Sequence, residues 1–333
     1  MLSILGMGYH LPENEIDNDF LHKEVGLEKG PDWVASRLGI HKRYSVLSRE
    51  YILKTKNADP SMAIAYARAH RSTPVTMGAL AARKAMKHAG IGPEKVGWII
   101  ANNDTPFETI PCTANLIAKE LGIGSGPHCD INSACSSFAR HMKELADIKE
   151  SHLPEFVLCV QTSAYTVRTD YSSKSIDGYI WGDGATAEVL STRHRGRLSV
   201  EPLIFETQPS EADDIVIDSV GHFRQNGAAV REFSIRKTCE MFEHIAHKKD
   251  LFAEHAYTVA HQANYVMQDS IIGHLDLPHE RHLRNVHEQG NIAAAGCPSV
   301  IAQKLDTLHK GDQLIYAVLG SGLAWGGGYM EVL

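Results

Sequence analysis

The residue best suited to nucleophilic chemistry is Cys135, in the run His-Cys-Asp-Ile-Asn-Ser-Ala-Cys-Ser-Ser-Phe-Ala-Arg-His-Met that spans 128–142. An extended piece over 127–131 leads into small residues, and from Ser136 apolar residues recur every three or four positions, which predicts a helix. A cysteine at the first turn of a helix lies beside unpaired backbone N–H groups and the positive end of the helix dipole. Both lower the pKa of a thiol. The alternative is a small, buried and inert thiol.

Two later segments carry a base and an amide donor. The run Tyr-Thr-Val-Ala-His-Gln-Ala-Asn, 257–264, predicts a buried strand that ends at His261, with Asn264 at the start of the next helix. In 288–299, Asn291 precedes a helix of small residues. Active sites of layered α/β proteins collect at such strand-to-helix junctions. A nucleophile, a base and an amide donor are the groups that acyl transfer needs, although each alone also fits a structural role.

The contexts of these three residues resemble one known family. Cys135 in Ser-Ala-Cys-Ser-Ser-Phe, His261 in His-Gln-Ala-Asn and Asn291 in Gly-Asn-Ile-Ala-Ala-Ala look like the Cys-His-Asn triad of the β-ketoacyl-acyl-carrier-protein synthase III (FabH-like) family of the thiolase superfamily. The likeness extends from near residue 1 to residue 333. It implies an α/β, thiolase-like fold, in which two pseudo-symmetric halves form a five-layer αβαβα arrangement.

A faint internal repeat agrees with two such halves. A tryptophan, a glycine cluster and then Glu-Val-Leu occur over 181–190 and again over 325–333. We therefore predict a boundary between residues 1–190, which carry the cysteine, and residues 191–333, which carry the histidine and the asparagine. Glycine clusters before strands also arise by coincidence, which is the alternative explanation.

The elements that must position these side chains follow from local patterns. The N-terminal apolar run 1–12, broken by two glycines, predicts a strand, and an acidic stretch over 15–25 predicts a helix. A helix over 75–88 has Thr73 as its N-cap, a proline at its first position and Gly90 as its terminator. Segment 44–72 is predicted to contain a short helix and is longer than in typical family members, so it either shapes substrate entry or only fills space.

The resemblance also implies contacts with coenzyme A and pantetheine. Trp33 and Arg37 are four positions apart, so on a helix they share a face and can hold a planar group between indole and guanidinium. In the family these positions clamp the adenine of coenzyme A. A third expected contact is Arg168, and Asn264 is expected to hold pantetheine. Without the resemblance, Trp33 is simply a surface residue covered by the stem of an arginine.

The expected acyl pocket includes Leu319 and Ile110. The second of these holds a position where relatives usually have a phenylalanine that reaches across a dimer interface and closes the partner's pocket. The resemblance therefore implies a homodimer, and the aliphatic side chain implies a changed pocket shape. Asp104 falls near the place where condensing relatives outside this family have an acidic base, and its alternative role is an aspartate that forms a turn.

The reaction implied by the family begins with an acyl thioester attacked by the Cys135 thiolate. The N–H groups of Cys135 and Ser321 hold the oxyanion, although the family usually has glycine at the second position. A malonyl-type thioester then loses CO₂, and its enolate, stabilised by His261 and Asn291, attacks the acyl-cysteine. The substrates are acyl-CoA or acyl carrier protein thioesters, and no cofactor is expected.

Other reactions remain open. The same acyl-cysteine can pass its acyl group to a hydroxyl or amine of a secondary metabolite, or take part in a non-decarboxylative condensation of two acyl chains. A non-catalytic dimer partner is a third alternative, although the complete triad argues against it. A degradative thiolase needs a second cysteine near the last glycine loop, and residues 311–333 contain none.

An acyl carrier protein is a further candidate partner, and it needs a basic patch on which to dock. Family members commonly have an arginine two residues after His-Gln-Ala-Asn, where this chain has Val266. A predicted helix over 228–248 offers Arg231, Arg236 and Lys237 instead. A solvated basic edge explains these three residues equally well.

Composition excludes several classes of protein. The chain has 333 residues, 43% hydrophobic and 22% charged, and a net charge of -7 that leaves no basic stripe for nucleic acid. No apolar run reaches the ~18 residues of a membrane span. The N-terminal run lacks a charged leader, and the six cysteines have no paired spacing, which favours reduced thiols in the cytoplasm. Four histidines between 274 and 287 are spaced irregularly, so no metal site is predicted.

Overall fold

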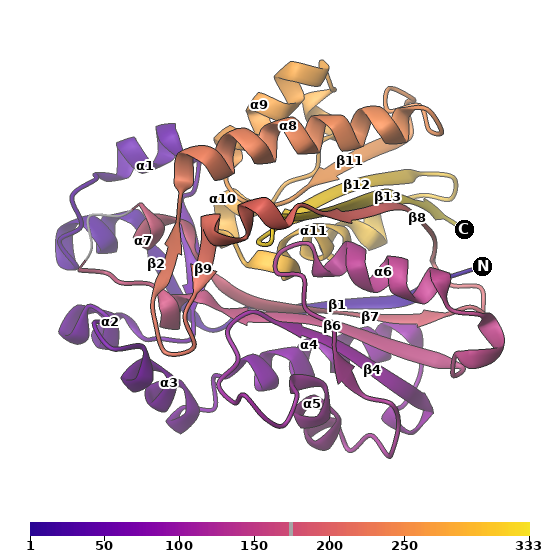
Figure 1. Cartoon of the computed structure of the whole chain (residues 1–333), viewed down its shortest axis with the longest axis horizontal. Coiled ribbons are helices and arrows are strands. Elements are labelled where there is room, and N and C mark those ends of the chain that lie inside the picture. The colour runs from indigo at the N-terminus through magenta and orange to yellow at the C-terminus, as the bar shows by residue number, and fades with distance from the viewer. Residues whose placement is uncertain (173–175) are drawn as a thin grey trace.

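Strands with continuous apolar runs are buried here between layers of helices. The computed structural model describes residues 1–172 and 176–333 (Figure 1). Nine strands form one hydrogen-bonded series in the order β11-β12-β13-β8-β1-β7-β6-β4-β5. One half of it contains β1 (Ser3–His10), β7 (Asp183–Ser191), β6 (Phe156–Ala164), β4 (Val96–Asn103) and β5 (Cys129–Asp130). The other contains β8 (Leu198–Thr207), β13 (Ala324–Val332), β12 (Gln313–Gly320) and β11 (Ala256–Ala260).

Helices complete the layers. Figure 1 shows α6 (Ser137–Asp147) and α11 (Gly296–Lys304) between the two halves of the strand series. The outer faces are covered by α4 (Pro74–Ala89) and α5 (Thr113–Leu121) on one side, and by α8 (Gly227–Ala246) and α9 (Tyr265–Leu275) on the other. Smaller elements are α1 (Pro31–Arg37), α2 (Arg49–Thr55), α3 (Pro60–Ala69), α7 (Asp177–Ile180), α10 (Val286–Gln289), β2 (Asn14–Asp17), β3 (Lys42–Ser45), β9 (Ile215–Ile217) and β10 (Phe223–Gln225). The predicted α/β, thiolase-like fold with its αβαβα layers is confirmed.

The two halves repeat one topology. In the first half, β1 pairs antiparallel with β7, β7 pairs antiparallel with β6, and β6 pairs parallel with β4. In the second, β8, β13, β12 and β11 pair with the same sequence of directions. The halves join where β1 meets β8, over only two residue pairs. The Glu-Val-Leu runs lie at the ends of β7 and β13, which occupy equivalent places, while the exact boundary at 190/191 stays a prediction.

Local signals predict some elements well and others poorly. The Thr73 hydroxyl accepts a hydrogen bond from the Thr76 N–H at 3.1 Å, and Gly90 ends α4 with a φ of 69°. The helix predicted over 15–25 is wrong at its start, because Asn14–Asp17 pairs with β3 as strand β2 and only Phe20–Glu24 is helical. Segment 44–72 holds two helices, α2 and α3, rather than one.

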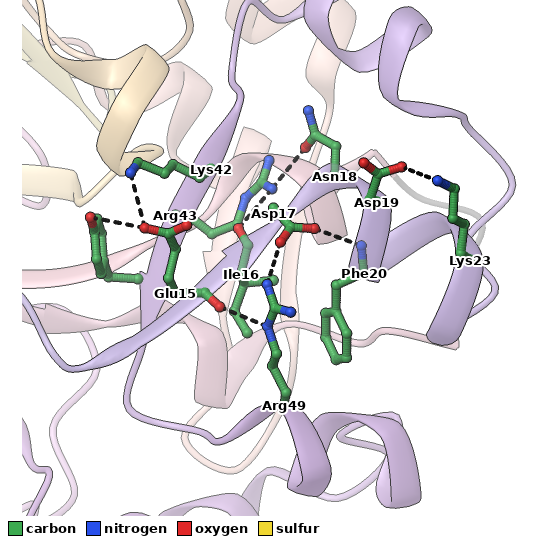
Figure 2. A network of polar contacts seen from close by, with 11 residues as sticks. Glu15, Ile16, Asp17, Asn18, Asp19, Phe20, Lys23, Lys42, Arg43 and Arg49 are labelled. Atoms are coloured by element: carbon green, nitrogen blue, oxygen red, sulfur yellow. Dashed lines mark hydrogen bonds and ion pairs between the residues drawn. The ribbon is translucent and has the colours of Figure 1, made fainter.

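A buried arginine fastens the β2–β3 pair to the rest of the molecule. The Arg43 side chain is 1% exposed, and its guanidinium donates to the Ile16 carbonyl at 3.2 Å and to Asn18 Oδ1 at 2.8 Å (Figure 2). It also donates to the Tyr179 carbonyl at 2.6 Å, at the end of α7. Acceptors from two segments far apart in the chain, one with Ile16 and Asn18 and the other with Tyr179, therefore converge on one side chain. The neighbouring Lys42 forms ion pairs at the surface with Glu15, which Figure 2 also shows, and with Glu288.

Candidate active site

One cavity of about 290 Å³ brings together the three residues singled out by their motifs. Cys135, His261 and Asn291 all line it, although they lie far apart in the chain. Most of the remaining wall is apolar and comes from both halves of the molecule. It includes Leu38, Ile180, Trp181, Ile215, Phe223, Met267 and Leu319. An apolar cavity with a few polar groups at one point suits a ligand with a hydrocarbon chain and one reactive polar group.

The strand, turn and helix predicted around Cys135 are present as β5, a turn and α6. The backbone of Ala134 has a φ of 47°, in the left-handed region that is strained for alanine. Its N–H donates to the side-chain oxygen of Asn132 at 2.8 Å, which holds this turn. Gly320 at the end of β12 lies directly against the turn, because a Cβ there would come within 2.7 Å of the Cys135 nitrogen.

The prediction that the pKa of Cys135 is lowered is wrong. Burial raises the pKa of this thiol well above its usual value, and the nearby charge of Asp104 raises it further. A backbone N–H and the Tyr165 hydroxyl act in the opposite direction with a smaller effect. The thiol is only 8% exposed, so loss of hydration outweighs the favourable helix start. The resting group is therefore a neutral thiol that must lose its proton before it can attack.

His261 follows directly after β11 and is held by its backbone. Its N–H donates to the Ala317 carbonyl of β12 at 2.9 Å, and the residue is 7% exposed. Burial lowers the pKa of the imidazole to about 4. The ring is therefore neutral at pH 7 and carries one N–H with which it can donate a hydrogen bond.

Asn291 presents its amide in a defined orientation. Its backbone bridges to Trp181, since its N–H donates to the Ile180 carbonyl at 2.9 Å. Its Oδ1 accepts from the Ala293 N–H at 2.9 Å. Because the oxygen is used in this way, the NH₂ group is the part left to donate to a ligand. Gly290 precedes it with a φ of 69° and packs so closely on Arg43 that a Cβ would lie 2.8 Å from that side chain.

Trp33, Arg37 and Asn264 line the same cavity, as expected for residues that share one ligand. Their elements are joined, since the Tyr265 N–H at the start of α9 donates to the Leu38 carbonyl just after α1 at 2.9 Å. The Asn264 side chain accepts from the Met267 N–H at 2.8 Å, so its oxygen caps α9. The contacts of these residues with coenzyme A stay predictions.

Leu319 and Ser321 also line the cavity, whereas Arg168 and Ile110 do not. The Arg168 side chain is buried and donates to the carbonyls of Ser219 at 3.2 Å and Gly221 at 3.3 Å. Its guanidinium thus holds a loop, and its expected contact with coenzyme A has no support from this placement. Ile110 is 84% exposed on the surface, and its place in a partner's acyl pocket stays a prediction.

A tyrosine that no motif indicated completes the wall beside the sulfur. Tyr165 lines the cavity next to Cys135, and its hydroxyl donates to Asp104 Oδ2 at 3.3 Å. Tyr165 directly follows strand β6, as His261 follows β11, so a position at the end of a strand was the signal that could have indicated it.

The remaining polar candidates have structural partners. His282, one of the four clustered histidines, bonds to Thr258 Oγ1 at 2.8 Å and Gln268 Oε1 at 3.0 Å. In residues 1–172 and 176–333, no group of three or more His, Cys, Asp or Glu side chains is arranged to hold a metal ion. Within the same ranges no helix has the length and apolar character to cross a membrane.

The basic residues of α8 are divided between two roles. Arg236 and Lys237 both form ion pairs with Glu240, at 2.9 and 2.7 Å. Arg231 lines the same cavity as Trp33 and Arg37. Docking of an acyl carrier protein on this helix stays a prediction.

Comparisons with known proteins agree with this arrangement. Residues 129–207 match the profile of 3-oxoacyl-[acyl-carrier-protein] synthase III, and residues 252–332 match that of the C-terminal part of the same family. A β-ketoacyl-[acyl-carrier-protein] synthase III of Bacillus pumilus is 27% identical over 329 residues, which cover 97% of this chain and 96% of the relative.

Solved structures share the fold across the whole chain. The 3-oxoacyl-[acyl-carrier-protein] synthase III of Aquifex aeolicus superposes with a TM-score of 0.84 at 24% identity, covering 99% of this chain and 100% of that one. OleA of Xanthomonas campestris, solved with bound lauric acid and lauroyl-CoA, has a TM-score of 0.80 at 18% identity and coverages of 99% and 98%.

Proposed function

The chain belongs to the 3-oxoacyl-[acyl-carrier-protein] synthase III (FabH-like) family of the thiolase superfamily, and on that premise we propose that it is an acyl-thioester condensing enzyme with an acyl-cysteine intermediate. Cys135 attacks an acyl thioester, and the N–H groups of Cys135 and Ser321 hold the oxyanion. A malonyl-type thioester then loses CO₂, and the resulting enolate attacks the acyl-cysteine to form a carbon–carbon bond.

The observation that carries this proposal is the convergence of Cys135, His261 and Asn291 on one largely apolar cavity. The polar groups there are suited to an enolate. His261 is neutral at pH 7 because burial lowers its pKa to about 4, so it donates one hydrogen bond without adding charge. The Asn291 amide donates from its NH₂ group, since Ala293 occupies its oxygen. Two donors can stabilise an enolate oxygen as its negative charge develops.

The cavity wall also supports a substrate that carries coenzyme A. Trp33 and Arg37 lie on α1 at the edge where that helix meets α9, and both face the cavity that contains the sulfur. The Lys29 ammonium, paired with Glu28, lies 5.6 Å from the centre of the Trp33 ring, and the cations in the cavity wall are Arg37 and Arg231. A planar, phosphorylated group fits an indole with cations beside it. OleA, a structural relative, binds lauroyl-CoA.

Intact-protein mass spectrometry after incubation with a panel of acyl-CoAs tests the first half-reaction. A mass gain equal to one acyl group, placed at Cys135 by peptide mapping and absent from Cys135→Ala, supports the proposal. Acylation of another cysteine in Cys135→Ala at the rate seen in the wild type contradicts it. Of the six cysteines, Cys112 and Cys129 are the partly exposed ones and serve as the internal control for non-specific acylation.

Release of labelled CO₂ from malonyl-CoA or a malonyl carrier protein tests the second half-reaction. Asn291→Ala should retain acylation of Cys135 and lose CO₂ release, because the amide acts only on the enolate. Acylation without CO₂ release from either malonyl thioester would instead indicate transfer to a hydroxyl or amine, or condensation of two acyl chains. The homodimer and the acyl carrier protein remain part of the proposal, the first supported by the large exposed side chain of Ile110.

A further inference from the structure

A second polar group lies against the nucleophile, in addition to His261 and Asn291. It consists of Tyr165 and Asp104, each directly after a strand that runs parallel to its neighbour. The adjacent strands β6, β4 and β5 end at the same edge of the sheet, and they are followed by Tyr165, Asp104 and the turn with Cys135. The order of the strands therefore brings these three side chains together.

The contacts form a chain of hydrogen bonds that ends at the sulfur. The Tyr165 hydroxyl donates to Asp104 Oδ2 at 3.3 Å, and it lies within hydrogen-bonding reach of the Cys135 thiol, whose pKa it lowers. One hydroxyl can donate one hydrogen bond and accept another, so the S–H group can donate to Tyr165 while Tyr165 donates to Asp104. This directionality is the one that proton transfer from sulfur to carboxylate requires.

Both ends of this series of hydrogen bonds, Asp104 and Tyr165, are held by neighbouring groups. Asp104 Oδ1 accepts from the Asn102 amide at 2.8 Å, and the same amide donates to Asn132 Oδ1, which holds the turn before Cys135. The Tyr165 ring stacks on Trp181 with the ring centres 4.0 Å apart. The segments of Asp104 and Tyr165 are also joined directly, because the Ala164 N–H donates to the Thr105 hydroxyl at 2.7 Å.

We propose that Tyr165 and Asp104 form a proton relay that accepts the proton of the Cys135 thiol during acylation. This inference rests on the proposed acyl-cysteine chemistry and adds two residues to it. Tyr165 is assigned a catalytic role, since it lines the cavity within hydrogen-bonding reach of the reacting sulfur, and Asp104 acts through it as the proton acceptor. The relay thereby supplies a base to a thiol that is buried and neutral at rest.

Each step of the relay balances. The S–H bond of Cys135 breaks as an O–H bond forms at Tyr165, and the phenolic proton of Tyr165 moves to Asp104. The thiolate forms a C–S bond with the acyl carbon, and the sulfur of coenzyme A leaves as a thiolate. The proton then returns from Asp104 through Tyr165 to the leaving thiolate, which departs as a thiol and leaves Asp104 ionised.

Electrostatics agrees with a shared proton. Burial raises the pKa of Asp104 to about 6, and the titratable groups that face it in the described chain are Tyr165 and Cys135, beside the neutral amides of Asn102 and Asn132. The charge of Asp104 also raises the pKa of Cys135. A thiolate and a carboxylate together would repel, whereas moving one proton between them keeps a single negative charge.

The test uses Asp104→Asn and Tyr165→Phe in the full-length protein. The rate of Cys135 alkylation by iodoacetamide is measured from pH 5 to pH 9 by peptide mass spectrometry, with Cys135→Ala as the background. In the wild type we expect the rate to rise near pH 6, as Asp104 ionises. Both variants should lose this rise, and their acylation by acyl-CoA at pH 7 should fall by about 10²- to 10⁴-fold, the usual contribution of a general base.

A thiol that reacts faster when the charge of Asp104 is removed overturns the relay. If Asp104 only repels the thiolate, Asp104→Asn will react faster than the wild type at pH 7 to 8, because its thiol then ionises more easily. If the alkylation rate of Cys135 still rises near pH 6 in both variants, the relay is also refuted. Tyr165→Phe keeps the ring that stacks on Trp181, so it remains informative if Asp104→Asn fails to fold.

The two readouts separate the relay from the proposed function. If the wild type is acylated and both variants are acylated at the same rate as the wild type, the relay is refuted and the proposed function stands. No acylation of the wild type by any acyl-CoA refutes the proposed function, and the alkylation profile then still decides whether Asp104 and Tyr165 take the thiol proton.

Discussion

Replacing Gly320 by alanine should displace the nucleophile while leaving the protein folded. A Cβ at this position would lie 2.7 Å from the Cys135 nitrogen and 2.8 Å from both the Ser133 oxygen and the Ser136 nitrogen. The shortest of these is 0.7 Å less than the 3.4 Å at which ordinary contact begins. All three atoms are backbone atoms of one turn, so no side-chain rotation can relieve the clash. Such overpacking costs about 1–3 kcal/mol.

The turn must therefore move away from the end of β12, and Cys135 moves with it. Since a misplacement of about 1 Å can cost a factor of ~10² in rate, we expect acylation of Cys135 to slow by roughly 10- to 100-fold. The assay is the rate of acyl mass gain at Cys135 from an acyl-CoA, with the free energy of unfolding measured in urea.

A matched substitution controls for the change from glycine to alanine itself. Gly273 lies in α9, and a methyl group added there would have no atom of another segment within 4 Å, so Gly273→Ala should leave acylation unchanged. It should also stabilise the helix by up to about 1 kcal/mol, because alanine is the better helix former. Wild-type acylation and stability in Gly320→Ala would show that the turn is not held against β12 as described.

Two stability predictions follow from buried polar side chains. Burial raises the pKa of Glu188 to about 8, so the folded protein keeps a proton that the unfolded chain releases at lower pH, and the wild type loses stability as the pH rises toward 8. Glu188→Gln removes this loss. Between pH 5 and pH 8, the free energy of unfolding of the variant in urea should therefore increase by about 3 kcal/mol relative to that of the wild type. The same difference between variant and wild type at both pH values would contradict this prediction. Arg43→Met should destabilise the protein by about 3 kcal/mol or more, because buried acceptors at Ile16, Asn18 and Tyr179 lose their donor. Its neighbour Lys42→Met should cost less than about 1 kcal/mol, since its ion pairs with Glu15 and Glu288 lie at the surface, and similar urea midpoints for the two variants would refute this contrast.

Local patterns were sufficient where neighbours in the chain decide the structure. The cap at Thr73 and the terminator at Gly90 act within one helical turn, and α4 has both. The strand before His261 and the helix after it are likewise present, because an apolar run and an asparagine cap are local signals. The motifs around Cys135, His261 and Asn291 also indicated the family, since each is a short contiguous run.

Local patterns failed where distant segments pair. The acidic stretch 15–25 predicted a helix, but Asn14–Asp17 forms a strand because β3 supplies its backbone hydrogen-bond partners. The contact of Arg168 with coenzyme A, implied by the family resemblance, stays a prediction; its guanidinium donates to two carbonyls more than fifty positions away. Partners that lie so far away in the chain cannot be identified from the segment itself.

The amino-acid sequence alone determined which reactive groups this protein has and which short elements hold them, since helix caps, strand runs and motif contexts act over a few residues. Only the tertiary structure decided how those groups behave. The order of β6, β4 and β5 places Tyr165 and Asp104 beside Cys135, and burial in that place raises the pKa of a thiol that its helix alone would lower. The reason is physical: hydration and charge depend on what surrounds an atom in space, and spatial neighbours are set by strand order.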